Sequence, residues 1–302
     1  MFPVTKIRAK ELLGERFPED GRADFWIYGV SDPEEPEDHT IIFVKNQIEA
    51  HVQEVRESIF LMQEKTELSL GSSCIGLKSK MPKNLYGELL NRMTEQMPKT
   101  ELLLQDGSYL SADVKLGERV KIGSFCVIGR DVVIGDDCEI GAGTIIRDHV
   151  RIGNRVQIKE RCIIGAEDAD IYRLEDGTCR TLPHLAGTVI EDGCLLLAGA
   201  ILAAGDTRTT VLKKGSMIGM LGDVGHNCRI GEQTLISGKA SISGHCQIGD
   251  HVYVAPMAVT TNRIDVGDQA YLGLGAVAIK DVPENEKQFG NPARKVLEKK
   301  KG

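Results

Sequence analysis

The sequence lacks several features that would assign it to a common class of protein. It carries no excess of positive charge: the formal net charge is −7 and the pI is ≈ 5.6, which argues against a general binder of nucleic acid or of anionic membranes. No apolar run approaches the roughly 18 residues needed to span a bilayer. The charged N-terminus lacks the apolar centre of a signal peptide. These absences favour a cytoplasmic protein without a membrane span.

Metal-binding patterns are also missing. No two cysteines stand in a CxxC pair, and no two histidines stand in the HxxxxH pair of zinc enzymes built on hexapeptide repeats. The sequence therefore predicts a protein that works without a bound metal.

Aromatic residues are scarce and unevenly placed. Eight of the fourteen lie before residue 107, whereas only seven of the 33 glycines lie at or before it. We therefore predict a small α/β domain over residues 1–106, a glycine-rich domain over 107–280 and a tail over 281–302. In the first domain, apolar spacing predicts helices within 5–17, 51–63 and 82–93, and strands within 25–32 and 40–46.

An apolar residue returns every six positions through the second domain, 24 times between Leu110 and Leu272. All of these anchors are aliphatic except Thr260. The residue two places before each is small or β-branched, and glycine often follows. A six-residue period predicts a parallel β-helix in which three hexads close one triangular coil. The 24 hexads predict about eight coils.

The cysteines fit this period. Six of the eight occupy the small position that faces inward, where they act as buried hydrophobes, and we expect all eight to be reduced. The six are Cys126, Cys138, Cys162, Cys194, Cys228 and Cys246.

Two segments interrupt the period and shift its phase: residues 166–187 and the shorter 205–210. Loops that leave a solenoid commonly line its binding face. We expect both excursions to lie near the functional site, although either is also compatible with a tolerated surface insertion.

The order of these parts resembles the UDP-3-O-acylglucosamine N-acyltransferases of lipid A biosynthesis, and more broadly the left-handed β-helix sugar N-acyltransferases. The resemblance includes KELLGERF, IYGVSDPEEPEDHTIIFVKN, the excursion DIYRLEDGTCRTLPHLAG, the loop GDT and the motif VGHNCRIG. It implies a left-handed parallel β-helix behind a nucleotide-binding domain. It also implies a homotrimer with active sites between neighbouring prisms.

The resemblance further implies roles for single residues. His226 aligns with the general base that deprotonates the acceptor amine, and Gly244 with the glycine whose N–H faces the thioester oxygen. Phe43 and Asn46 align with groups that hold the nucleotide base. Histidine, with a pKa near 6.5, suits proton transfer at neutral pH, yet a solvated corner histidine, a core phenylalanine and a purely structural glycine are equally ordinary features of such a fold.

Other candidates follow from position. His245 adjoins Gly244 and Asp223 precedes His226 by three residues, so both are candidate contacts to the sugar. Arg294 and Lys295 are candidate contacts to coenzyme A phosphates, because the ending FGNPARKV is similar to hexapeptide enzymes that use this donor. A charged tail is also commonly just solvated.

The sequence departs from the lipid A family at several positions. Gly219 and Met220 replace an Asp-Asn pair, Arg263 replaces a second histidine, Glu49 replaces a second base-stacking aromatic, and the family's long C-terminal extension is not found. We therefore expect an N-acyltransferase that uses acyl-coenzyme A, most simply acetyl-coenzyme A, on a nucleotide-linked amino sugar. The alternatives are the acyl-carrier-protein-dependent lipid A reaction, sugar O-acetylation and a non-catalytic scaffold.

Overall fold

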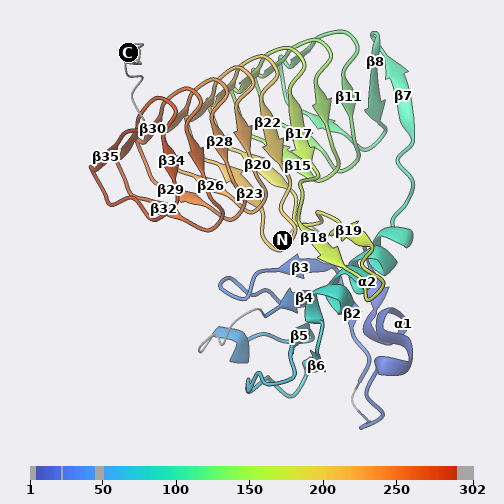
Figure 1. The fold of residues 1–302 in the computed structure, drawn as a ribbon. Helices are drawn as coiled ribbons and strands as arrows, with labels where there is room; N and C mark the ends of the chain where they lie inside the picture. The colour runs from blue at the N-terminus through green and yellow to red at the C-terminus, as the bar shows by residue number, and fades with distance from the viewer. Residues whose placement is uncertain (1–4, 22, 45–50, 291–302) are drawn as a thin grey trace, which may run out of the picture.

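The structure is a computed structural model that describes residues 5–21, 23–44 and 51–290. It consists of a long β-helix and a smaller N-terminal α/β part that lies against one side of it (Figure 1). Among the described residues, no helix is long and apolar enough to cross a membrane.

The N-terminal part contains a parallel sheet in the order β3-β4-β5-β6, and a short antiparallel pair β1-β2. Helix α2 begins with Pro82 at its first turn, where proline suits the helix geometry, and packs against β5 and α1. The elements are β1 (Ile7–Arg8), α1 (Ala9–Leu13), η1 (Gly14–Arg16), β2 (Trp26–Ile27), β3 (Gly29–Ser31), β4 (Thr40–Phe43), η2 (His51–Gln53), β5 (Ile59–Gln63), β6 (Ile75–Ser79) and α2 (Pro82–Glu95).

One predicted helix is wrong. Residues 51–63 form the short 3-10 helix η2 and the strand β5, not a helix. Four consecutive apolar residues of β5, from Ile59 to Met62, are buried. A parallel strand covered on both faces requires this continuous apolar run, and the run satisfies a helical spacing as well.

The predicted β-helix is confirmed, and its strands pair in parallel along three faces. The first face contains β10 (Lys121–Ile122), β13 (Glu139–Ile140), β16 (Gln157–Ile158), β21 (Leu195–Leu196), β24 (Met217–Ile218), β27 (Leu235–Ile236), β30 (Tyr253–Val254), β33 (Tyr271–Leu272) and β35 (Lys287–Gln288). The second contains β8 (Ser108–Ser111), β11 (Val127–Ile128), β14 (Ile145–Ile146), β17 (Ile163–Ala166), β22 (Ile201–Ala203), β25 (Asp223–Val224), β28 (Ser241–Ile242), β31 (Val259–Thr260) and β34 (Val277–Ala278), with β7 (Leu102–Gln105) antiparallel to β8. The third contains β9 (Lys115–Leu116), β12 (Val133–Ile134), β15 (Val150–Ile152), β20 (Thr188–Ile190), β23 (Thr210–Leu212), β26 (Arg229–Ile230), β29 (Gln247–Ile248) and β32 (Asp265–Val266).

These strands make nearly nine coils in the described part of the chain, slightly more than the predicted eight. The additional strands β34 and β35 follow Leu272, but alanine and glutamine stand where the earlier coils have a large aliphatic anchor. The core is otherwise the predicted column of anchors with the six inward cysteines, all of them buried and none in a disulfide. Each buried aliphatic side chain contributes about 1.5–3 kcal/mol.

The long excursion is not a free surface loop. It forms a hairpin of β18 (Ile171–Arg173) and β19 (Cys179–Thr181) that leaves the β-helix and reaches α2 (Figure 1). Tyr172, Leu182 and Leu185 of this excursion are buried within the hydrophobic core of the N-terminal part. The core of the N-terminal part therefore includes side chains from the excursion, while the anchors of the β-helix form a core of their own.

Candidate functional site

The candidate site lies on the corner between the second and third faces, where both excursions leave the β-helix. The same corner recurs after β17, β22, β25 and β28 in four successive coils. It presents Asp168 and Asp170 from the first coil, Asp206 from the second, His226 from the third and His245 from the fourth. Stacking of one corner thus brings together polar groups that are far apart in the sequence.

The buried His226 pairs with the half-buried Asp168. The imidazole Nδ1 lies 2.8 Å from the Asp168 Oδ2, and the backbone N–H of His226 donates to the same oxygen at 3.2 Å. Only 6% of His226 is exposed. A carboxylate on Nδ1 fixes the ring orientation and places the reactive lone pair of the neutral imidazole on Nε2.

Burial alone disfavours the charged imidazole, but the Asp168 hydrogen bond and the nearby Asp206 charge outweigh it and raise the pKa of His226 above its usual value. The same hydrogen bond lowers the pKa of Asp168. Each partner thus favours the charged form of the other.

Two further histidines touch the ring of His226 edge-on: His184 at a centroid distance of 5.4 Å and His245 at 5.1 Å. Burial lowers the pKa of both, and the His226 charge lowers it further; for His245, where Arg263 also contributes, the pKa falls to about 3. His184 accepts the backbone N–H of Asp168 through Nε2 and makes its other ring contact with the carbonyl of Leu182. Neutral His184 thereby holds the segment that carries Asp168.

Two acidic side chains, Asp206 and Asp170, lie close to His226. Asp206 is fully buried, and burial together with the neighbouring Asp170 raises its pKa to about 7. Burial also opposes the charge of Asp170, but contacts with Asp206 and Lys83 reverse this and bring its pKa to about 2. Within the described part of the chain, the Asp206 Oδ2 has no hydrogen-bond partner.

Asn227 organises the short excursion that carries Asp206. Its side-chain oxygen accepts the backbone N–H groups of Asp206, Thr207 and Arg208 at 3.0, 3.3 and 3.2 Å. Its amide donates to the Asp206 Oδ1. The loop is therefore fixed by one buried residue of the next coil, and a buried polar group that is satisfied in this way is costly to disturb.

The four side chains Asp170, Asp206, His226 and His245 each place one ligand atom within 4.8 Å of the others. Carboxylate and imidazole atoms at such separations are able to hold a cation. An HxxxxH pair could not reveal this arrangement, because two of its members lie in the two excursions and the two histidines in two further coils.

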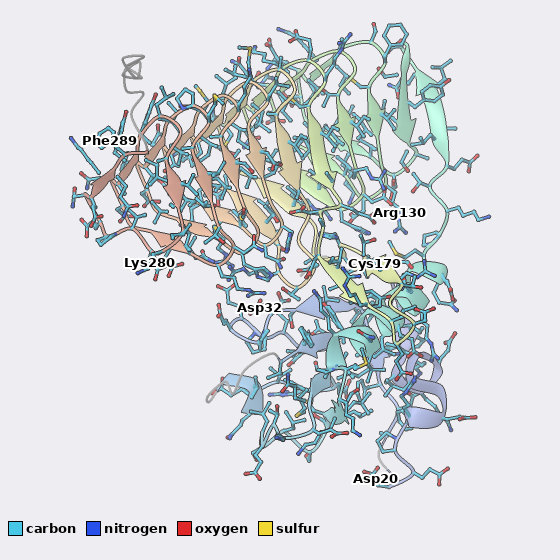
Figure 2. All side chains as sticks on the ribbon, viewed as in Figure 1. Asp20, Asp32, Arg130, Cys179, Lys280 and Phe289 are labelled. Atoms are coloured by element: carbon cyan, nitrogen blue, oxygen red, sulfur yellow. The ribbon has the colours of Figure 1, made fainter. Side chains whose placement is uncertain are left out.

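These groups open into a cavity of about 510 Å³ between the β-helix and the N-terminal part. Asp32, which is labelled in Figure 2 where the two parts meet, also lines the cavity. The N-terminal part contributes Phe43, whose ring stacks on Tyr86 with centroids 5.4 Å apart, and Lys83, which pairs with Asp170. A ligand in this cavity would contact both parts of the chain.

The structure brings together some of the predicted residues. His226, His245 and Phe43 line this one cavity. Gly244 lies directly against the His226 ring, so that a Cβ there would overlap the imidazole. Asp223 does not line the cavity; its side chain bonds Ser241 on the neighbouring strand at 3.1 Å. Asn46, Glu49, Arg294 and Lys295 lie outside the described residues.

Sequence reasoning missed Asp168, Asp170 and Asp206. All three lie in the two excursions, which were expected near the site, and the segments EDAD and GDT display them openly. Acidic residues in loops are common, however, and the 58 positions between Asp168 and His226 concealed their contact.

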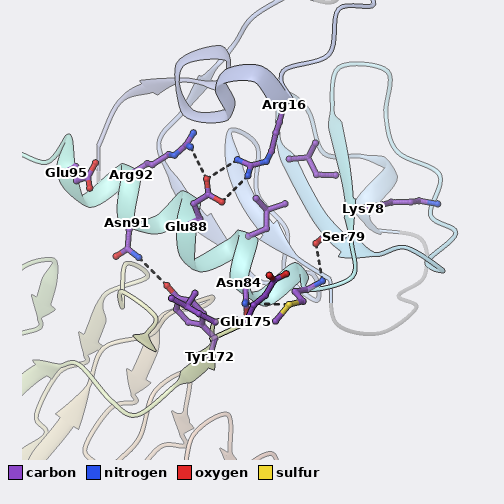
Figure 3. Close-up of a pocket in the computed structure, with 14 residues that line it drawn as sticks. Arg16, Lys78, Ser79, Asn84, Glu88, Asn91, Arg92, Glu95, Tyr172 and Glu175 are labelled. Carbon is purple, nitrogen blue, oxygen red and sulfur yellow. Dashed lines mark hydrogen bonds and ion pairs between the residues drawn. The ribbon is translucent and has the colours of Figure 1, made fainter. Parts of the chain in front are cut away.

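A second cavity of about 810 Å³ lies over α2 in the N-terminal part (Figure 3). Three of its charged groups bind one another: Arg16 binds Glu88 through two hydrogen bonds, and Arg92 binds the same carboxylate at 2.8 Å. This network ties η1 to α2. Among the described residues, no buried polar side-chain atom of this cavity lacks a partner, so the network supports the fold rather than a site.

The fold and the site define a hexapeptide-repeat β-helix with a histidine–aspartate pair at one corner. The family described as bacterial transferase hexapeptide (six repeats) matches residues 113–147, 131–166 and 227–262. The crystal structures of a Francisella novicida UDP-N-acetylglucosamine acyltransferase and a Moraxella catarrhalis UDP-N-acetylglucosamine O-acyltransferase share the fold, with TM-scores of 0.56 and 0.58. They are 24% and 18% identical, cover 62% of this chain each, and are matched over 66% and 71% of their own lengths. The predicted left-handed parallel β-helix is thereby confirmed.

Two curated relatives that match part of the chain carry the same enzyme name. The UDP-3-O-acylglucosamine N-acyltransferase of Cytophaga hutchinsonii is 30% identical over 83 residues, and that of Chlorobium luteolum is 35% identical over 81 residues. These matches cover 28% and 27% of this chain, and 24% and 23% of the relatives. The chain thus spans about a quarter of the length of the relatives it matches. The predicted resemblance to sugar N-acyltransferases is confirmed.

Proposed function

We propose that the protein is an N-acyltransferase that moves an acyl group from a thioester to the amine of a nucleotide-linked sugar. The observation that carries this proposal is the His226–Asp168 pair at the wall of a cavity shared with the N-terminal part. The relatives named UDP-3-O-acylglucosamine N-acyltransferase support the acceptor chemistry.

In the proposed reaction the amine nitrogen attacks the thioester carbonyl carbon. Nε2 of His226 takes the proton that the nitrogen loses, and Asp168 stabilises the resulting imidazolium. The tetrahedral intermediate then collapses, the carbon–sulfur bond breaks and the thiolate takes up a proton. Asp168 is a positioning residue because it acts only through His226.

Three further assignments concern residues in or beside this cavity. We assign Gly244 to the oxyanion, because its backbone adjoins the His226 ring and a fixed N–H there would stabilise developing charge by a few kcal/mol. We assign Phe43 to the nucleotide base, because its ring lines the cavity in the N-terminal part. His245, whose ring lies next to that of His226, also lines the cavity and is assigned to the sugar.

We propose acyl-coenzyme A with a short acyl chain as the donor. The support is that the FGNPA segment resembles the ending of hexapeptide enzymes that use coenzyme A. The proposed assembly is a homotrimer, which is supported by a largely apolar surface hollow that includes Ile163, Ile201 and Leu221. Seven buried thiols suit a reducing compartment, which supports a place in the cytoplasm.

A thiol-release assay tests the proposal. Acetyl-, butyryl- and longer acyl-coenzyme A, and acyl-carrier protein, would each be supplied with UDP- and dTDP-linked amino sugars. We expect thiol release that depends on an amino sugar. If only sugars with hydroxyl acceptors turn over, the enzyme is an O-acyltransferase and the proposal is wrong. If no pair of donor and acceptor turns over, the result favours a non-catalytic scaffold.

His226→Ala tests the base. Loss of general-base catalysis should lower kcat by about 10²- to 10⁴-fold. Because the ring is buried and bonded to Asp168, the thermal midpoint should fall as well, so the rates are compared at a temperature where both proteins are folded. His251→Ala provides an exposed histidine of the same β-helix as the control. Activity within a few-fold of wild type would remove His226 from this role.

A further inference from the structure

We infer that Asp206 and Asp170, together with His226, form a binding site for a primary ammonium group. This inference rests on the proposed function and deepens it: the site would recognise the protonated amine of the acceptor sugar. It would therefore select an amine over a hydroxyl before any chemistry takes place.

The first observation is a buried carboxyl oxygen that has no hydrogen-bond partner. Asp206 is fully buried and lines the cavity, yet its Oδ2 has no hydrogen-bond partner among the described residues. Its other oxygen is held by Asn227, so the carboxyl group cannot turn away without losing that bond. A buried acceptor without a donor is costly in the empty protein, and a ligand N–H supplies the missing donor.

The second observation is the number and spacing of the acceptors. A primary ammonium has three N–H donors, and acceptors arranged tetrahedrally around it at hydrogen-bond distance stand roughly 4.7 Å apart. Atoms of Asp170, Asp206 and His226 lie within 4.8 Å of one another. Asp168 occupies the Nδ1 of His226, which leaves Nε2 as the third acceptor.

The third observation is the charge around the cavity. Among the described residues, its lining contains four acidic side chains, Asp32, Glu34, Asp170 and Asp206, and two bases besides the histidines; of the acids, Glu34 pairs with Arg208. Both bases are engaged: Lys83 binds Asp170, and Arg263 donates to the Nε2 of His245 at 3.0 Å. A hydroxyl gains little from this excess of negative charge, whereas an ammonium is attracted by it.

The same arrangement places an N–H group of the ammonium beside the base that removes its proton. The bound ammonium transfers one N–H proton to Nε2 of His226, which releases it to solvent, and the neutral amine that remains attacks the thioester carbon. The nitrogen then loses a second proton to Nε2, from which the departing thiolate takes it. Until the attack, Asp170 and the ionised form of Asp206, which the ammonium charge favours, accept the other two N–H groups. Recognition and activation of the nucleophile thus use the same three residues.

Equilibrium binding without an acyl donor tests the site. UDP- and dTDP-glucose would be compared at pH 7 with the matching nucleotides that carry an amine at carbon 2, 3 or 4. We expect wild type to bind at least one amine about 10- to 100-fold more tightly than its hydroxyl counterpart. Asp206→Asn should reduce that preference to less than about threefold with hydroxyl-sugar affinity retained.

Asp170→Asn is the second variant, should Asp206→Asn fail to fold, and it should reduce the preference as well. Asp176→Asn, which removes an exposed acid from the tip of the same excursion, is the matched control and should keep the full preference. Equal affinity for every amine and hydroxyl pair in wild type, absence of binding included, would overturn the inference.

Metal analysis separates the ammonium site from a metal site. One equivalent of Zn²⁺ or Mn²⁺ in purified wild type that Asp206→Asn lacks would assign the cluster to a metal and overturn the inference. The binding measurement needs no thioester, so it can fail while amine-dependent thiol release stands. In that case the acyltransfer proposal survives and only the ammonium site is lost.

Discussion

At the residue scale, Asp168 controls the protonation of His226. Because the Asp168 contact contributes to the raised pKa of His226, kcat/KM should rise as pH increases through a value above 6.5. Asp168→Asn removes that contribution, so the pKa falls and the acidic limb should move to lower pH. The maximal rate should also fall, by up to about 10⁴-fold, because an amide no longer holds the productive tautomer.

The pH dependence of kcat/KM, measured for wild type, Asp168→Asn and the control Asp176→Asn, checks this expectation. Asp176 is exposed and does not line the cavity, so its profile should coincide with that of wild type. An unchanged acidic limb in Asp168→Asn would mean that another group governs the ionisation.

Gly244 has a steric reason to be glycine. A Cβ at this position would lie 2.7 Å from Nε2 and 2.8 Å from Nδ1 of His226, closer than side-chain atoms approach one another. Gly244→Ala should therefore displace the imidazole and lower kcat by roughly 10²-fold or more.

Gly238→Ala is the control for that substitution. Gly238 stands at the equivalent place after its own anchor, two residues beyond Ile236, and its nearest neighbour is a carbonyl oxygen at 3.1 Å. Steady-state kinetics and thermal unfolding of the two variants should show a kinetic defect only for Gly244→Ala. Equal activities would show that the ring tolerates the methyl group.

Residues within the hexads were predictable because each has a fixed position in the repeat. The phase of the hexads placed Cys228 and Ile230 inward and left His226 outside the core, as the structure confirms. Asp168 and Asp206 were not predictable, because their contacts with His226 and Asn227 depend on where two non-repeating excursions turn back. The repeat carries no information about those turns.

At the element scale, α2 and the hairpin β18-β19 meet at Gly87. A Cβ on Gly87 would lie 2.6 Å from the Tyr172 ring. Gly87→Ala gains about 1 kcal/mol of helix propensity, but forcing a methyl group into a packed contact typically costs about 1–3 kcal/mol. We expect the cost to prevail because Tyr172 is buried, and the thermal midpoint should fall by roughly 2–4 °C.

Differential scanning calorimetry checks this, with Glu95→Ala at the exposed end of the same helix as the control. A higher midpoint for Gly87→Ala would show that the Tyr172 ring moves aside at little cost and that helix propensity decides the outcome.

The same elements show why secondary structure was only partly predictable. Helix α2 was expected because its apolar residues keep a helical spacing behind a proline at the first turn. The region that became β5 has an apolar run that fits either a helix or a buried strand. Its pairing with β4 and β6 on both sides decided the matter, and pairing between segments is a tertiary property.

At the scale of the whole molecule, the β-helix was predictable and the docking of the N-terminal part was not. A constant six-residue period specifies one kind of coil, each of which contacts only its neighbours. The docking depends on Tyr172, Leu182 and Leu185, which belong to the β-helix in sequence but are buried with Leu12 and Tyr86. The core of the N-terminal part therefore contains residues of the excursion as well as residues that precede position 106.

Residues 1–106 alone should consequently fold poorly. Without the excursion, the fragment exposes the faces of α2 and α1 that Tyr172, Leu182 and Leu185 cover, and burying each such side chain contributes about 1.5–3 kcal/mol. We expect a broad thermal transition and binding of a hydrophobic dye, against a sharp transition for the full chain. Joining residues 166–187 to the fragment through a flexible linker should sharpen the transition and reduce dye binding. A sharp transition for the fragment alone, unchanged by the added segment, would show that the N-terminal core is complete without the excursion and that the two parts are independent domains.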